Sequence, residues 1–171
     1  MELGLKRKTV RIDDYNPEWK DYFLKEKEIL SNKLSDYDIV IEHIGSTSIV
    51  GCAAKPIIDI AIGVPYLEYG KQLIPLLEEI GWTYDGTSDF GVRWFLKKCN
   101  GVVRTHFLHI EDRNSRIWQN HIVFRDYMNL HPEKIKEYSD LKKKLKKNML
   151  IIEKDMRKLR IRLSKMLSVT L

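Results

Sequence analysis

The sequence predicts one domain of the α/β or α+β class, a mixed sheet flanked by helices with a helical C-terminal part. Two runs rich in isoleucine and valine near the middle of the 171-residue chain indicate buried strands. In the second half, Asn100-Gly101 is the preferred two-residue hairpin turn. Helical periodicity appears before, between and after these strands. Without internal repeats or linkers, residues 1–171 are expected to form a single domain.

The first predicted helix begins at Asn16-Pro17-Glu18. Asparagine caps a helix, proline tolerates its first position, and glutamate is favourable in its first turn. One apolar stripe then recurs with helical spacing, made of Trp19, Tyr22, Phe23, Ile29, Leu30 and Leu34.

The two central strands are predicted at Ile39–Ile44 and from Pro56 to about Gly63, with a glycine turn at Gly45 and small residues between them. Their core segments, Ile39–Ile44 and Ile57–Ile62, are expected to be adjacent in the sheet.

A second helix is predicted over Leu67–Ile80, kinked or interrupted at Pro75 and ended by Gly81. A short strand at Trp82–Tyr84 and a polar loop at Asp85–Gly91 are expected to follow.

Strands at Val92–Cys99 and Val102–Ile110 flank the Asn100-Gly101 turn, and a loop is expected at Glu111–Asn114. Ser115 is positioned to cap the next helix.

The helix after Ser115 is interrupted at His131-Pro132, and residues from Glu133 to about Leu167 are predicted to be helical with a break near Asn148. Residues 133–171 contain 13 Lys and Arg but only 5 Asp and Glu, although the whole chain carries a net charge of +6. This basic segment indicates either a solvated helix face or attraction for nucleic acid or polyphosphate, but no nucleic-acid-reading motif accompanies it.

Composition excludes several classes of protein. No apolar run approaches the roughly 20 residues that a membrane helix needs. Met1–Val10 contains a basic cluster without an apolar stretch, so it is not a secretory signal. Cys52 and Cys99 lack metal-ligand spacing. We therefore expect a cytoplasmic protein with reduced cysteines and no membrane partner.

Polar side chains interrupt the apolar central strands, where burial is costly unless the group is satisfied. They are Glu42, His43, Ser46, Thr47, Lys55 and Asp59. Glycine at position 45 lets the backbone approach a ligand, and Ser46 and Thr47 offer donors for phosphate oxygens. Asp59 on the neighbouring strand is suited to hold a magnesium ion that bridges to those phosphates.

Five segments resemble the GrpB family over roughly residues 9–145, which leaves 146–171 as a basic helical extension. They are VRIDDYNPEW at Val10–Trp19, HIGSTS at His43–Ser48, AAKPIIDI at Ala53–Ile60, RTHFLHI at Arg104–Ile110 and FRDYMNLHPE at Phe124–Glu133. The family is similar to a branch of the polymerase-beta-type nucleotidyltransferase superfamily. In that superfamily a Gly-Ser turn precedes a strand with an Asp-x-Asp pair. A GrpB-like domain also occurs fused to dephospho-coenzyme-A kinases.

The residues and the resemblance together define a candidate site. Asp59 and His109 are the candidate catalytic residues, and Asp59 is also the candidate magnesium ligand. The candidate phosphate- or nucleotide-binding residues are His43, Gly45, Ser46, Thr47, Lys55, Arg93, Arg104 and His106. Among them Arg93 and Arg104 are expected to sit across the hairpin from each other and clamp an anion.

The chain departs from the superfamily pattern at Ala61, which stands where the second carboxylate would be. A two-metal mechanism is therefore in doubt. The predicted strand Val102–Ile110 carries no acidic residue to replace it. His106 and His109 are three residues apart, so they are expected to face opposite sides of the sheet, and which of them is functional stays open.

Two main hypotheses follow. The chain is either a magnesium-dependent nucleotidyltransferase or a module that binds a nucleotide or other phosphorylated ligand without chemistry. A nucleic-acid-binding protein is the third and weaker interpretation.

The remaining candidates are assigned structural roles. His121 and His131 are interpreted as packing and capping residues, and Arg125 as an ion-pair partner of Asp126 or a C-terminal acid. The four tryptophans are expected in the core.

Overall fold

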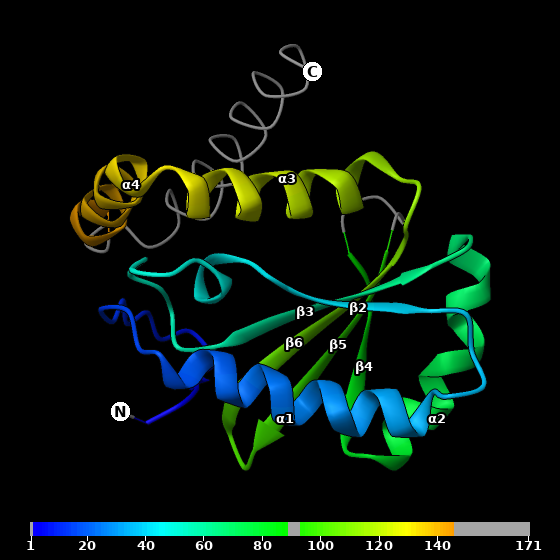
Figure 1. Cartoon of the computed structure of the whole chain (residues 1–171). Helices are drawn as coiled ribbons and strands as arrows, with labels where there is room; N and C mark the ends of the chain where they lie inside the picture. Colours follow the sequence, from blue (N-terminus) through cyan, green and yellow to red (C-terminus); the bar gives the residue numbers. More distant parts are fainter. Residues whose placement is uncertain (1, 89–92, 146–171) are drawn as a thin grey trace.

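A computed structural model describes residues 2–88 and 93–145 of the chain, which alternate between helices and strands (Figure 1). In chain order the elements are β1 (Leu5–Lys6), α1 (Glu18–Lys33), β2 (Val40–Ile44), the 3₁₀ turn η1 (Ser46–Ser48), β3 (Ile58–Val64), the 3₁₀ segment η2 (Leu67–Gln72), α2 (Leu73–Glu79), β4 (Trp82–Ser88), β5 (Arg93–Asn100), β6 (Val103–Asp112), α3 (Arg116–Leu130) and α4 (Pro132–Leu145). The predicted mixed α/β architecture is confirmed.

The sheet has the order β2-β3-β6-β5-β4, and β1 pairs with β6 beside this path. β3 and β6 run parallel, whereas the β2–β3, β6–β5 and β5–β4 pairs are antiparallel. The two central strands predicted from the sequence are neighbours, with Ile44 opposite Asp59 and Val40 opposite Gly63.

Helices lie on both faces of the sheet, with α1 and α2 on one side and α3 across the other (Figure 1). Successive strand residues point to opposite faces. In β3, Ile58, Ile60 and Ile62 are buried in the cluster that includes α1 and α2 residues. Ala61 instead packs against Trp118 of α3. The α3 side therefore holds Asp59, and this alternation decides which side chains can reach it.

The start of α1 follows the predicted capping pattern. The side-chain Oδ1 of Asn16 accepts a hydrogen bond from the Glu18 backbone N–H at 3.1 Å. Trp19 is 1% exposed. All four tryptophans are buried, as expected.

The segment after β3 differs from the single kinked helix expected. It forms η2 and then α2, which begins at Leu73. Pro75 therefore lies in the first turn of α2, where backbone N–H groups have no intrahelical acceptor to lose. The break precedes the proline rather than coinciding with it.

Two strands are longer than predicted, and one was missed. β4 continues to Ser88 through an irregularity between Tyr84 and Thr87, so the expected loop is wrong at 85–88. The remainder of that loop lies outside the described residues. β6 continues to Asp112, which brings Glu111 into the sheet and shortens the expected loop there. The missed β1 has only two residues, too few for an alternating pattern.

At the other end of the fold, Ser115 caps α3 by accepting a hydrogen bond from the Trp118 backbone N–H at 3.3 Å. α3 ends before His131, whose Nδ1 lies 2.8 Å from the Tyr127 carbonyl oxygen, as its predicted capping role requires. α4 then begins at Pro132. The expected helix beyond residue 145 and its break near Asn148 lie outside the described residues.

Two further properties bear on the sequence predictions. The described helices are all too short or too polar to cross a membrane. Cys52 is buried, Cys99 is exposed, and both are free thiols.

Candidate functional site

The turn that joins β2 to η1 is built around Gly45. Its backbone has φ +72° and ψ −169°, a conformation that essentially only glycine adopts without strain. A Cβ at this position would lie 2.6 Å from Asp59 Oδ2. Glycine is therefore required both by the turn and by the carboxylate beside it, and the Gly45 backbone and Asp59 form one surface.

Two buried side chains support the turn from the α1 side. His43 Nε2 lies 3.0 Å from Thr47 Oγ1, and the His43 ring stacks on Phe23 of α1 at 4.6 Å between centroids. Burial lowers the pKa of His43 to about 4, although Asp59 opposes the shift. His43 is thus neutral near pH 7 and helps to hold the turn. Ser46 and Thr47 are also buried, at 7% and 3% exposed.

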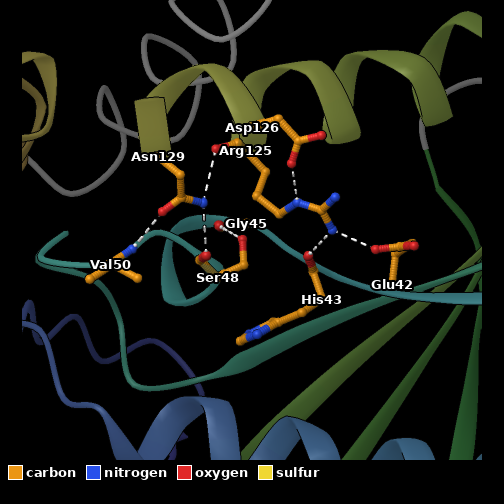
Figure 2. A network of polar contacts seen from close by, with 8 residues as sticks. All are labelled: Glu42, His43, Gly45, Ser48, Val50, Arg125, Asp126 and Asn129. Carbon is orange, nitrogen blue, oxygen red and sulfur yellow. Dashed lines mark hydrogen bonds and ion pairs between the residues drawn. The ribbon is translucent and has the colours of Figure 1, made fainter. Parts of the chain in front are cut away.

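α3 is connected to the same turn by Asn129 (Figure 2). Its Nδ2 donates to the Ser48 carbonyl oxygen at 3.3 Å, and its Oδ1 accepts from the Val50 backbone N–H at 2.9 Å. Ser48 Oγ in turn donates to the Gly45 carbonyl oxygen at 2.7 Å. These contacts fix the turn on the Asp59 side of the sheet.

Arg125 of α3 provides the second connection in Figure 2. Its Nη1 donates to Glu42 Oε2 at 2.5 Å and to the His43 carbonyl oxygen at 3.1 Å. Its Nε donates to Asp126 Oδ1 at 2.7 Å, which is one of the two ion pairs anticipated for this residue. The guanidinium therefore joins α3 to Glu42 and His43, the β2 residues that closely precede the Gly45 turn.

Asp59 and His109 meet on this face of the sheet. His109 Nε2 lies 3.6 Å from Asp59 Oδ1, and the Asp59 side chain is 29% exposed, which leaves it open to a ligand. Burial lowers the pKa of His109, and the contact with Asp59 only partly offsets this. A neutral imidazole beside a carboxylate is suited to accept or hold a proton.

The structure adds a buried carboxylate to this face that the sequence interpretation missed. Glu111 is fully buried, with Oε1 3.5 Å from Arg93 Nη1 and 3.4 Å from His121 Nε2. Burial raises its pKa, but the contacts with His121, His109 and Arg93 outweigh this, so the net pKa is lowered. The alternation Phe107, His109, Glu111 was the available signal, because a strand continued by two residues places Glu111 on the face of His109. His121 is therefore part of a charged cluster, not only a packing residue.

Two of the other candidate residues, His106 and Arg104, make their contacts away from Asp59. His106 faces α1 and contacts Trp82 at 6.2 Å between ring centroids, opposite to His109 as predicted. Arg104 donates to the backbone carbonyl oxygens of Leu5 and Lys6 at 3.5 and 3.1 Å. The expected anion clamp is wrong. Arg93 begins β5, whereas Arg104 lies near the start of β6, opposite Cys99 at the far end of β5, so the two arginines are at opposite ends of the hairpin. Lys55, half-buried, lies in the connection that leads into β3.

The comparison with protein families identifies the chain. The family model described as "GrpB protein" matches residues 9–158. The chain belongs to the GrpB family.

Several GrpB relatives are substantially similar to it. The UPF0157 protein YqkA of Bacillus subtilis is 41% identical over 139 residues, which are 81% of this chain but 40% of YqkA. The glutamate-rich protein GrpB of Alkalihalophilus pseudofirmus is 36% identical over 150 residues, 84% of each protein. The crystal structure of GrpB from Enterococcus faecalis has a TM-score of 0.79 and 31% identity, covering 91% of this chain and 98% of that one.

The fold is nucleotidyltransferase-like. The Cid1 poly(U) polymerase, solved with MgGTP bound, matches with a TM-score of 0.50 and 16% identity over 71% of this chain and 40% of Cid1. At this identity the likeness shows the fold alone.

In this GrpB chain the residues do not fit a two-metal centre. Ala61 is fully buried against Ile44 and Trp118, so α3 covers the position where a second carboxylate would stand. Glu42, directly across from Ala61, is paired with Arg125. The described ranges contain no group of three or more metal-ligating side chains. Asp59 suits one magnesium ion that also borrows ligand oxygens, as magnesium commonly does.

Proposed function

We propose that this GrpB-family chain binds a nucleotide or another phosphorylated small molecule at the Gly45–Thr47 turn. The observation that carries the proposal is the contact between Gly45 and Asp59. Only glycine leaves the backbone close enough for a phosphate to approach while a partly exposed carboxylate lies at the same place.

Each residue has a defined task in this proposal. The backbone of the Gly45–Thr47 turn and the Ser46 hydroxyl face the phosphate oxygens, while Thr47 and His43 hold the turn from the α1 side of the sheet. Asp59 holds a magnesium ion that neutralises phosphate charge when a ligand is bound. Asn129 and Arg125 hold α3 against the turn and the end of β2.

Group transfer is the second candidate function, and the Asp59–His109 pair favours it. A neutral His109 beside Asp59 can accept a proton from a hydroxyl that attacks a ligand phosphorus, while the P–O bond to the departing phosphate or pyrophosphate breaks. The resulting imidazolium would be stabilised by the carboxylate. The burial of Ala61 under Trp118 opposes a two-metal version of this reaction. Binding is therefore the primary proposal, with single-metal transfer as its extension.

The test is a thermal-shift panel of ATP, UTP and inorganic tripolyphosphate, each with and without magnesium. A ligand at 100 times its Kd stabilises by about 2.7 kcal/mol, which corresponds to about 5 to 11 °C for a chain of this size. Asp59→Asn should keep its fold and lose the magnesium-dependent part of the shift. Asp21→Asn, which removes an exposed carboxylate of α1, is the matched control and should respond like the unmodified protein.

Two results would contradict the proposal. One is the absence of any shift with all three compounds at millimolar concentration. The other is a magnesium response in Asp59→Asn equal to that of the unmodified protein.

A further inference from the structure

Two phenylalanines lie side by side on the Asp59 face of the sheet. Phe95 of β5 and Phe107 of β6 have ring centroids 5.3 Å apart with an interplanar angle of 56°. Both side chains are partly exposed. In the described structure neither belongs to a buried apolar cluster or packs against one, unlike the other aromatic residues of the sheet, Trp82, Trp94 and Tyr84. They are therefore not explained as core.

This aromatic pair is continuous with the proposed phosphate site. Phe107 is the direct neighbour of Asp59 across the parallel β3–β6 pair. Phe95 contacts the His109 ring at 5.2 Å, and His109 in turn contacts Asp59. Gly45 follows the β2 residue paired with Asp59, so Phe107 lies two strand spacings, or about 10 Å, from the turn. The base and the phosphates of one nucleotide can occupy both places together.

The charges beside the pair also suit a nucleotide. The Arg104 guanidinium carbon lies 5.7 Å from the centre of the Phe107 ring. Lys97 is the direct neighbour of Phe107 on β5, and its Nζ contacts Asp85 Oδ1 at 2.9 Å. Aromatic rings on a sheet surface, with arginine nearby, are the usual stacking surface for unpaired bases.

We propose that Phe95 and Phe107 form a stacking platform for the base of the ligand bound at Gly45 and Asp59. The substrate class is then a nucleoside phosphate, and not an inorganic polyphosphate or a phosphorylated sugar without a base. This inference rests on the proposed phosphate site and adds the part that recognises the base. Because stacking tolerates any base, the platform is expected to bind purine and pyrimidine nucleotides alike.

The experiment compares the affinities of ATP, UTP and inorganic tripolyphosphate, with magnesium present, by calorimetry. Phe107→Ala should weaken ATP and UTP binding about 5- to 150-fold, the range typical for losing one stacked base. Tripolyphosphate affinity should change less than about twofold, because it has no base to stack. Phe107→Tyr, which keeps the ring, should restore nucleotide affinity. Phe95→Ala should act in the same direction as Phe107→Ala.

Two variants control for folding and for general loss of an exposed ring. Phe107→Leu keeps apolar bulk without an aromatic face and should bind nucleotides as weakly as Phe107→Ala. Tyr66→Ala removes an exposed tyrosine near η2 and should leave all three affinities unchanged.

The outcomes separate the two proposals. Equal affinity of the unmodified protein for tripolyphosphate and nucleotides, unaffected by Phe107→Leu, would overturn the platform and leave the phosphate site standing. Failure of all three ligands to bind would overturn both. Parallel weakening of tripolyphosphate and nucleotides in Phe107→Leu would show a general disturbance of the site and also reject the platform.

Discussion

Replacing Gly45 by alanine tests the central contact of the site. The new methyl group would be placed 2.6 Å from Asp59 Oδ2 and 3.0 Å from Asp59 Cβ. Both distances are too short for non-bonded atoms, so the Asp59 side chain would have to shift. The backbone conformation at Gly45 adds strain of its own, because φ is +72°. That strain alone costs about 1–3 kcal/mol for a residue with a side chain.

The expected result is a loss of stability of at least this size. For a chain of 171 residues it lowers the melting temperature by about 2 to 12 °C. Urea unfolding at pH 7 measures the free energy directly. Phosphate-ligand binding should weaken as well, since Asp59 must move away from the turn to make room.

Gly51→Ala is the matched control. Gly51 also has a positive φ, +80°, but a Cβ there would meet no atom within 4 Å. The Gly51→Ala variant therefore measures the cost of backbone strain without a steric clash. Gly45→Ala should be the more destabilising of the two, and Asp59→Ala should recover part of its cost in a double-mutant cycle, by at least about 0.5 kcal/mol. Equal losses in the two alanine variants, with no coupling to Asp59, would refute the claimed contact.

Two further predictions concern the support of the turn. Arg125→Met removes the donor to Glu42 and to the His43 carbonyl oxygen, so urea unfolding should show a loss of about 1–3 kcal/mol, and a cycle with Glu42→Gln should show coupling; additive losses would speak against the ion pair. The folded-state pKa of His43, about 4, lies below the ordinary 6.5, so the unfolded chain takes up this proton first as pH falls. The contribution of neutral His43 to the free energy of unfolding is complete above about pH 6.5 and is lost between about pH 6.5 and 4. Lowering the pH from 7 to 5 should therefore reduce the free energy of unfolding by about 2 kcal/mol more in the unmodified protein than in His43→Gln. Urea unfolding at both pH values checks this, and identical pH dependence of the two proteins would contradict it.

Local sequence patterns were sufficient for the main elements. Isoleucine-rich runs located β2 and β3, and Asn16 and Ser115 marked two helix starts. Asn100-Gly101 located the β5–β6 hairpin to within one residue, because Asn100 pairs with Val103 and the turn residues are Gly101 and Val102. These features depend on neighbours in the chain, namely side-chain alternation, turn chemistry and capping. The limits of β4 and β6 were wrong because strand length is decided by the pairing partner and not by the strand's own residues.

The composition of the site face was predictable only in part. Gly45 and Asp59 were expected to be close, and the β2–β3 register places them in contact. Glu111 and His121 come from a strand end and a separate helix, and only the packing of α3 on the sheet brings them within 3.4 Å. Arg93 and Arg104 lie toward opposite ends of the hairpin. Counting outward from the predicted Asn100-Gly101 turn already places Arg93 farther from it than Arg104.

The sequence by itself determined the fold class, the two central strands, the glycine turn and the absence of a second carboxylate at Ala61. Those properties follow from residue identity and short-range periodicity. Only the tertiary structure decided that Trp118 fills the space above Ala61, that Arg125 neutralises Glu42, and that Phe107 adjoins Asp59. Each of these contacts joins elements distant in the chain, and their closeness depends on sheet order and on the helix that covers each face, which local patterns do not specify.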